Sequence, residues 1–425
     1  MKVGIIIGRI GDVDGVALET EKWIKILQEM SHEVFILSGH FTKSVVGENH
    51  ETLIPNLSFF SPNCEWEQHR AFFFPPDDPS ELLDHLHRAS DELAIEMFKW
   101  IMRNKIDLII SENASALPAH LSMGMAIRKL VENTGLKIIC HDHDFYWERG
   151  TRYNTPFADV ESIIRATFPM QIPHARHAVI NSHSKRLLRE KYDIDSIVVP
   201  NVMDFSQPYA QKDDYNKDLL RAIGVKKTDI PLFQITRIVR RKGIETAIEL
   251  VNKLDDRNVK LVITGSAADD DRKGYYKELI EKIDDEKLNG RIIFAARRIL
   301  NCRTTDNDGR KIYSLSDAYA HAVACTYFSR YEGFGNAFVE AALAKRPIFV
   351  NNYKPVYWED LGSKGFKTVM IEDNRLTNKT LAEIDRIIHD KKMQKEIGEY
   401  NYMLGKRYYS YEVLQERMET LFYYI

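Results

Sequence analysis

The sequence has few cysteines, and none of them is spaced for a disulfide framework or a zinc site. Cys64, Cys140, Cys302 and Cys325 are scattered over 425 residues without a CxxC pair. This usage argues against a small disulfide-stabilised secreted domain, and it predicts reduced thiols in a cytoplasmic protein.

Long apolar runs and an excess of one charge are also missing. No run approaches the roughly 18 apolar residues of a membrane helix, and the N-terminal stretch MKVGIIIGRIGD is too short and too polar for a signal peptide. The 59 Lys and Arg residues nearly balance 62 Asp and Glu residues, for a net charge of −3. Binding to nucleic acid or to membranes through general basicity is therefore disfavoured.

What the sequence does contain is an alternation of buried strands and amphipathic helices. A Val- and Ile-rich strand at 2–8, a helix at 16–30 and a strand at 34–37 form one βαβ unit, which predicts a parallel sheet. The turn Pro200-Asn201 precedes a polar segment, and the alternation restarts with a strand at 232–235. These patterns predict an α/β fold.

The length suits two Rossmann-like domains of roughly 200 residues each. We expect an N-terminal domain over 1–205 and a C-terminal domain over 206–405, with a last helix of about 406–425 that packs back onto the first domain. The aromatic and Pro-rich stretch 50–80 is expected to be irregular.

The loop after the first strand lacks the nicotinamide-binding fingerprint. Gly8, Gly11 and Gly15 do not match GxGxxG, and Ser38-Gly39-His40, rather than an acidic residue, follows the second strand. A nicotinamide-dependent enzyme is therefore disfavoured. A loop whose backbone N–H groups approach a phosphate remains a workable interpretation.

A Gly-rich loop before an apolar helix is the most informative stretch, Ser329-Arg330-Tyr331-Glu332-Gly333-Phe334-Gly335-Asn336-Ala337-Phe338-Val339-Glu340. The two glycines permit a tight turn, and the N-terminus of the helix favours an anion. Glu332 in the loop and Glu340 in the first turns of the helix bracket this site. A simple glycine turn with two solvated acids is the competing interpretation.

A second candidate is the basic loop after the strand at 232–235. It carries Arg237, Arg240, Arg241 and Lys242 before Gly243 and a helix. Cations at a helix N-terminus suit a diphosphate. The alternative is a solvated basic loop.

The strand expected at 136–140 opens into the polar and aromatic sequence HDHDFYWER. Open α/β sheets bind ligands at the C-terminal ends of their strands, so His141 is a candidate for direct ligand contact. His141, Asp142, His143 and Asp144 also suggest metal ligands. Successive residues on an extended segment point in opposite directions, so the four cannot converge on one ion without a tight turn. We therefore predict no bound metal, and leave open a role for His143 as an ordinary surface or hydrogen-bonded residue.

The residues after His141 suit a small anionic ligand that contains a sugar. Aromatic faces pack against sugar rings, and arginine holds carboxylate or phosphate with two hydrogen bonds. The residues predicted to bind this soluble ligand are Asp142, Tyr146, Trp147, Arg149 and Arg152.

Four motifs in sequence order resemble the retaining glycosyltransferases of family 4, which have the GT-B fold of two Rossmann-like domains facing across a cleft. They are Val199-Pro200-Asn201-Val202-Met203-Asp204, where Val202 replaces the usual glycine, then Arg237-x4-Lys242-Gly243, Val262-Ile263-Thr264-Gly265-Ser266, and Glu332 to Glu340. Within the family, the stretches ENASALPAH and HDHDFYWER resemble the subgroup that makes small glycosides such as mannosylglucosylglycerate.

The resemblance implies a hexosyltransferase of the EC 2.4 class and assigns its catalytic residues. Arg237 and Lys242 would neutralise the leaving nucleoside diphosphate, Glu332 would hold hydroxyls of the donor sugar, and His141 would contact that sugar near the reacting carbon. Glu340 would hold the ribose. The other implied donor-binding residues are Gly15, Gly265, Arg298 in the base-reading segment, Gly333, Phe334, Gly335 and Asn336.

The resemblance also implies the partners. The small, soluble, anionic ligand expected at the residues after His141 would be the acceptor, which makes Asp142, Tyr146, Trp147, Arg149 and Arg152 the predicted acceptor-binding residues. The donor would be a nucleotide sugar of the GDP-mannose or UDP-glucose type, used as a co-substrate. No tightly bound cofactor is implied, and a divalent cation could stimulate the reaction. Two competing functions use the same fold: a sugar-nucleotide epimerase, and a non-catalytic protein that binds nucleotide sugars. An assay of donor hydrolysis separates the latter from an enzyme.

Overall fold

The computed structural model describes residues 1–12, 14–267 and 274–423, and it divides into two compact units. Unit 1 contains Met1–Asn201 and the C-terminal segment from Tyr411, and unit 2 contains Val202–Ser410. The division after Asn201 lies slightly before the expected boundary at 205. Both units are α/β with parallel sheets, as the alternation of strand and helix patterns predicted.

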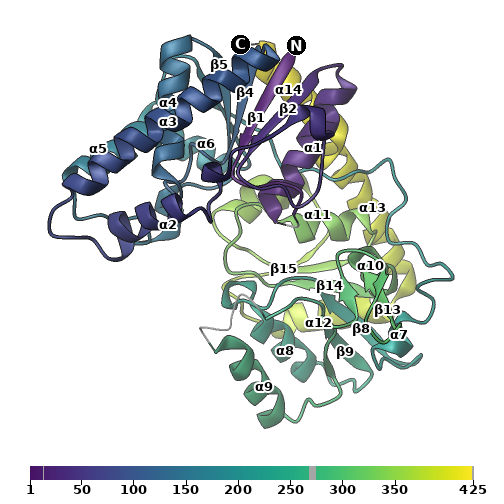
Figure 1. Cartoon of the computed structure of the whole chain (residues 1–425). Coiled ribbons are helices and arrows are strands. Elements are labelled where there is room, and N and C mark those ends of the chain that lie inside the picture. The colour runs from purple at the N-terminus through teal and green to yellow at the C-terminus, as the bar shows by residue number, and fades with distance from the viewer. Residues whose placement is uncertain (13, 268–273, 424–425) are drawn as a thin grey trace. The chain divides into compact units, whose positions relative to one another are not determined.

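Unit 1 is built on a seven-stranded parallel sheet in the order β3-β2-β1-β4-β5-β6-β7. Figure 1 labels its strands β1, β2, β4 and β5. Its strands are rich in Ile and Val because helices cover both faces of a parallel sheet; Ile5, Ile109 and Ile139 are fully buried. The strands are β1 Lys2–Ile7, β2 Glu33–Ser38, β3 Glu51–Leu53, β4 Leu108–Glu112, β5 Lys137–Asp142, β6 Ala175–Val179 and β7 Ser196–Val198.

The first helix of unit 1 begins at a side-chain cap. The side chain of Asp14 accepts hydrogen bonds from the N–H groups of Val16 and Ala17, which starts the first helix. The last helix contacts α1 and β7, so the chain returns to unit 1 at its C-terminal end. The helices are α1 Gly15–Glu29, α2 Pro62–Gln68, α3 Ser80–Asn104, α4 Leu121–Thr134, α5 Ala158–Thr167, α6 Ser182–Tyr192 and α14 Tyr411–Tyr423.

Two local expectations for unit 1 were wrong. The stretch 50–80 is not irregular throughout: it contains β3 and α2, and Ser61 caps α2 by accepting from the N–H of Cys64. Strand β5 also continues to Asp142 rather than ending at Cys140, because Asp142 pairs with Val179 of β6. His141 is therefore a strand residue.

Unit 2 is built on a six-stranded parallel sheet in the order β10-β9-β8-β14-β15-β16. Figure 1 labels its strands β8, β9, β14 and β15. A small second sheet, β11-β13-β12, has strands of two to four residues, too short to carry a sequence pattern. The strands are β8 Ile230–Gln234, β9 Val259–Ile263, β10 Ile292–Phe294, β11 Ile299–Leu300, β12 Thr304–Thr305, β13 Lys311–Ser314, β14 Ala324–Tyr327, β15 Ile348–Asn351 and β16 Val369–Ile371.

The helices of unit 2 bury their apolar faces against the larger sheet. Ile244, Ile248 and Val251 recur at helical spacing along one face of α8 and are fully buried. The helices are α7 Leu219–Ala222, α8 Ile244–Lys253, α9 Tyr275–Asp285, α10 Leu315–His321, α11 Asn336–Leu343, α12 Asn378–His389 and α13 Lys391–Tyr409. Among the described residues, no helix is long and apolar enough to cross a membrane.

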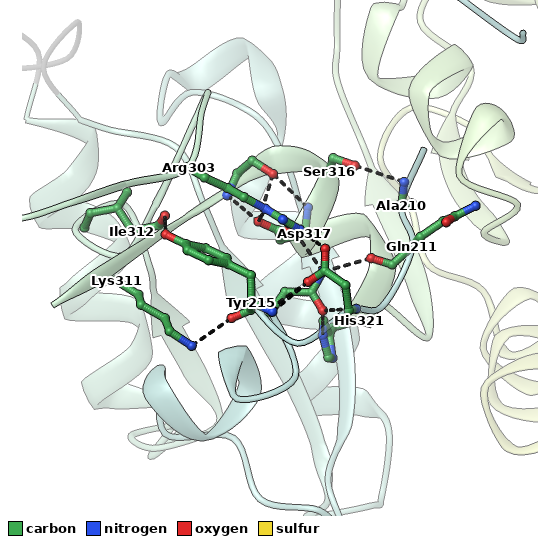
Figure 2. A network of polar contacts seen from close by, with 12 residues as sticks. Ala210, Gln211, Tyr215, Arg303, Lys311, Ile312, Ser316, Asp317 and His321 are labelled. Atoms are coloured by element: carbon green, nitrogen blue, oxygen red, sulfur yellow. Dashed lines mark hydrogen bonds and ion pairs between the residues drawn. The ribbon is translucent and has the colours of Figure 1, made fainter. Parts of the chain in front are cut away.

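A polar network anchors the segment before α7 to α10 (Figure 2). Arg303 donates to both oxygens of Asp317, at 3.0 and 3.2 Å from Nε, and its Nη2 lies 2.7 Å from Asp213. Asn216 Nδ2 donates to Asp317 as well, at 2.7 Å. Burial alone would raise the pKa of Asp317, but the hydrogen bonds from Arg303 and Asn216 outweigh it and hold the pKa at about 2.

Acid should weaken this network. The folded-state pKa of Asp317 is below its ordinary value of 3.8, so the stabilisation is complete above about pH 4 and is lost as the pH falls towards 2. Asp317→Asn should lower the Tm at pH 7 and show a smaller further loss than the wild type between pH 4 and 3. Thermal unfolding followed by circular dichroism measures this, with Asp308→Asn at an exposed ion pair as the control. Parallel acid losses in the wild type and Asp317→Asn would contradict the assignment.

Candidate active site

The site in unit 2 forms where the loops after two neighbouring strands meet. Strands β8 and β14 are hydrogen-bonded in parallel although 90 residues separate the two loops that follow them. Their C-terminal ends lie at the same edge of the sheet, as in other open α/β sheets. The basic loop and the Gly-rich loop are thereby brought together.

Two cations converge on Glu332. Lys242 Nζ donates to Oε1, and Arg241 Nη1 lies 2.6 Å from Oε2. Glu332 and Lys242 are both buried, whereas Arg241 is partly exposed. The trio carries one more positive than negative charge, so it favours an additional anion.

Burial lowers the pKa of Lys242 even though the charge of Glu332 opposes this shift, whereas the pKa of Glu332 is set mainly by its two cationic partners. Burial alone would raise the pKa of Glu332, but the charges of Lys242 and Arg241 outweigh it and hold that pKa below its usual value. Glu332 is therefore ionised at neutral pH and able to accept hydrogen bonds from hydroxyl groups.

Buried amide side chains fix the two loops. Gln234 Nε2 donates to the carbonyl of Lys242 at 3.0 Å, and Thr326 Oγ1 donates to Gln234 Oε1 at 2.7 Å. Asn351 Nδ2 donates to the carbonyl of Ser329 at 2.9 Å. These bonds satisfy backbone groups that would otherwise be buried without partners, and they limit how far the site residues can move.

The glycine-rich loop ends at the N-terminus of α11. Gly335 has φ +134°, a backbone conformation that L-residues rarely adopt, and the carbonyl of Phe334 accepts from Tyr353 Oη at 2.8 Å. The ring of Phe334 is buried, so only its backbone is placed for a ligand. Asn336 is the first residue of the helix, and Gly333 precedes Phe334 in the loop.

Glu340 lies within α11, as the sequence predicted. Tyr319 Oη on α10 donates to Glu340 Oε2 at 3.0 Å. Burial and this carboxylate together raise the pKa of Tyr319, so its hydroxyl stays protonated and donates. Glu332 and Glu340 are thus held by different partners and are not interchangeable.

The remaining donor-site candidates of unit 2 are Arg237, Gly265 and Arg298. Arg237 is exposed in the loop after β8. Gly265 follows β9, the neighbour of β8, and packs against the backbone of Thr236. Arg298 is half-buried over the ring of Tyr313, at 5.9 Å from its centroid, just before β11.

The candidate site of unit 1 is centred on His141. In the sheet register His141 of β5 lies directly opposite Glu112, the last residue of β4. His141 Nδ1 is 2.9 Å from Glu112 Oε2, and the ring of Trp23 from α1 stacks on the imidazole at 4.0 Å between centroids. The three side chains are buried.

His143 joins the same cluster. Its Nε2 lies 3.6 Å from Glu112 Oε2, and its ring is 4.3 Å from that of His141. Burial and the neighbouring His141 lower the pKa of His143. Contacts with the two imidazoles outweigh the burial of Glu112 and hold its pKa at about 2, so the carboxylate is ionised.

Asp142 and Asp144 face other partners. Asp142 is fully buried, and its Oδ2 lies 2.7 Å from Nδ1 of His177 on β6. Asp144 accepts from Asn113 Nδ2 at 3.0 Å and pairs with Arg149. The acceptor role expected for Asp142 stays a prediction.

The other predicted acceptor residues follow β5 in and after a short 3-10 helix, Tyr146–Arg149. Trp147 is stacked on Phe145 at 4.6 Å and on Tyr192 at 5.5 Å between ring centroids, so protein rings already pack against its indole. Tyr146 lines a cavity of about 730 Å³ together with Lys191 and Arg165. Arg149 and Arg152 are exposed.

Gly15 is the first residue of α1. A Cβ added there would meet no atom within 4 Å, so the fold itself does not require glycine at this position. The open space beside a helix N-terminus suits the approach to phosphate that the resemblance implies.

Sequence reasoning did not single out two residues of these sites. Arg241 was one of several cations in its loop, and only the β8–β14 pairing shows that it reaches Glu332. Glu112 is the last residue of β4, and His141 is the next-to-last residue of β5. Parallel pairing of these two strands places the two residues side by side.

Known proteins resemble this chain over nearly its whole length. A family model described as "Glycosyl transferases group 1" matches residues 216–403. Mannosylglucosylglycerate synthase of Thermotoga maritima is 32% identical over 441 aligned residues, which cover 98% of each chain. Mannosylglucosylglycerate synthase of Petrotoga mobilis is 30% identical over 87% of this chain and 86% of that protein.

The fold is shared more widely. The structure of a glycosyltransferase from Rickettsia africae ESF-5 superposes with a TM-score of 0.68 at 14% identity, covering 99% of this chain and 97% of that one. Because the match to the Thermotoga enzyme is nearly complete, and because the group 1 model covers the unit that holds Lys242 and Glu332, the chain belongs to the glycosyl transferases group 1 family and is a glycosyltransferase.

Proposed function

We propose that this glycosyltransferase moves a hexose from a nucleotide sugar of the GDP-mannose or UDP-glucose type to a small anionic acceptor such as a glucosylglycerate, with retention of the anomeric configuration. The observation that carries the donor half is the trio of Lys242, Arg241 and Glu332 beside the N-terminus of α11.

The chemistry follows from where charge develops. As the glycosidic bond breaks, negative charge grows on the leaving diphosphate, and Lys242 with Arg241 and Arg237 would stabilise it more in the transition state than in the ground state. Glu332 would then exchange part of its contact with Lys242 for hydroxyls of the donor sugar. Glu340 would accept from the ribose, held by Tyr319.

His141 completes the proposal from unit 1. Glu112 orients the imidazole through Nδ1, and Nε2 is buried with no hydrogen-bond partner among the described residues. In this proposal, Nε2 of His141 contacts the donor sugar near its reacting carbon. Glu112 acts through His141 and is therefore a positioning residue. The proposal needs no protein nucleophile.

The acceptor half rests on the basic and aromatic loop after β5. The two relatives are named as synthases of mannosylglucosylglycerate, and a glycerate carries a carboxylate. In this chain Arg149 and Arg152 are exposed. Tyr146 opens onto a cavity that is also lined by Lys191 and by Arg165, which pairs with Glu161 of the same cavity at 2.6 Å. These groups suit a small anionic sugar.

Product analysis tests the function. The enzyme is incubated with a panel of nucleotide sugars and with glycerate, glucosylglycerate and neutral glycosides, and products are identified by mass spectrometry and by the anomeric coupling in NMR spectra. A product of inverted configuration, or transfer to lipid acceptors alone, would overturn the proposal. Donor hydrolysis without transfer would leave only the donor half standing.

Arg149→Ala should raise the KM for the anionic acceptor by roughly 10-fold or more, the loss expected for one charge-assisted hydrogen bond. The rate of donor hydrolysis without acceptor should stay the same, because the donor contacts lie elsewhere. Initial-rate kinetics at varied acceptor concentration measure both.

Arg189→Ala is the matched control for this variant. Arg189 is exposed to a similar degree, 57% against 51% for Arg149, and also pairs with an aspartate, but it lies on α6. An unchanged acceptor KM in Arg149→Ala, or an equal change in Arg189→Ala, would remove Arg149 from the acceptor site.

A further inference from the structure

The cluster of Glu112, His141 and His143 has the composition of a metal site. One potential ligand atom from each residue lies within 4.8 Å of the other two. All three residues are at least nine-tenths buried. Two imidazoles and one carboxylate are a common ligand set for zinc in sites that keep a further position open.

The spacing of the ligand atoms fits one ion. Glu112 Oε2 lies 2.9 Å from His141 Nδ1 and 3.6 Å from His143 Nε2. Ligands about 2.0 to 2.2 Å from a tetrahedral ion are separated by roughly 3.4 Å. Small rotations of the side chains would therefore suffice to bind it.

The hydrogen bonding of the cluster is incomplete. Among the described residues, Glu112 Oε1, His141 Nε2 and His143 Nε2 have no hydrogen-bond partner, although all three atoms are buried. Buried polar atoms without partners are costly and require an explanation. In the described part of the chain, the ion-pair partners of the Glu112 carboxylate are these two imidazoles, so its charge has no permanent cation beside it.

We propose that Glu112, His141 and His143 bind one divalent transition-metal ion of the zinc type. The ion would supply the missing positive charge and a partner for Nε2 of His143. Coordination through Nδ1 of His141 would leave the proton on Nε2, so that this nitrogen would donate to a substrate oxygen. This last consequence rests on the proposed function, whereas the site itself does not.

The proposal departs from the expectation of no bound metal. That expectation assumed that His141, Asp142, His143 and Asp144 were the available ligands, and alternation along the strand prevents those four from converging. The third ligand comes instead from the neighbouring strand, because β4 and β5 place Glu112 beside His141.

Metal binding to the full-length chain tests the proposal without using activity. Protein freed of metal by a chelator and checked by elemental analysis is titrated with Zn²⁺ in a calorimeter, and with Co²⁺ as a visible-absorption probe. One Zn²⁺ per chain should bind, and Co²⁺ should give the bands of a nitrogen- and oxygen-ligated site. His143→Gln and Glu112→Gln should each weaken Zn²⁺ binding by more than about 10-fold.

His389→Gln is the matched control. His389 is a surface residue beside Asp256 and Asp385, at 3.1 and 3.4 Å, and such a site can collect metal adventitiously. Loss of binding in His389→Gln alone, or equal affinity in the wild type and both cluster variants, would overturn the proposal. If both cluster variants fail to fold, the test is the Co²⁺ spectrum of the wild type. Absence of the bands of a nitrogen- and oxygen-ligated site would then overturn the proposal. The two proposals can fail separately. A chain that binds no metal can still transfer a sugar, and a chain that forms no product can still bind the metal.

Discussion

Lys242→Ala should lower kcat by roughly 10²- to 10³-fold, the loss seen when one preorganised group that stabilises transition-state charge is removed. The affinity for the donor should fall much less. The reason is that the diphosphate gains negative charge as the glycosidic bond breaks, so the ammonium group acts mainly on the transition state. Lys242 is buried beside Glu332, where water screens the charge poorly.

Steady-state rates with varied donor, together with the Kd of the nucleoside diphosphate from calorimetry, separate the two effects. Lys253→Ala is the control, because Lys253 lies at the far end of α8 and pairs with Glu249 at 2.7 Å. An unchanged kcat in Lys242→Ala would remove this residue from the mechanism. Equal losses in donor affinity and kcat/KM, with kcat intact, would make it a binding residue only.

Gly265→Ala should destabilise unit 2 by about 3 kcal/mol or more, at the upper end for overpacking in a well-packed region. A Cβ at this position would lie 1.9 Å from the carbonyl oxygen of Thr236 and 2.6 Å from the Cα of Arg237. Both are backbone atoms, so no side-chain rotation relieves the clash. The loop that carries Arg237 and Lys242 must shift, and activity should fall with stability.

Gly15→Ala provides the contrast for the stability measurement. No atom lies within 4 Å of its added Cβ, and the residue begins α1, where alanine is tolerated. We expect a change of less than about 0.5 kcal/mol in the free energy of unfolding. Chemical denaturation of both variants, followed by fluorescence, measures the difference. Equal stabilities would show that the loop after β9 adjusts to the extra methyl group.

Much of this architecture could be predicted from the sequence because its signals are local. Runs of Ile and Val, amphipathic helix patterns and the turn at Pro200-Asn201 act over a few neighbours, and they indicated two α/β units. The Gly-rich loop and the basic loop were also visible as separate motifs. Their family resemblance linked them to one chemistry, which the curated relatives support.

The tertiary structure decided which of these residues meet. Strand order placed β8 beside β14, so Arg241 joins Lys242 on Glu332, and it placed β4 beside β5, so Glu112 rather than Asp142 contacts His141. Asp142, adjacent in sequence to His141, points to the other face of the strand and binds His177. Such pairings depend on hydrogen bonds between strands far apart in the chain, and the periodicity of a single segment carries no information about them.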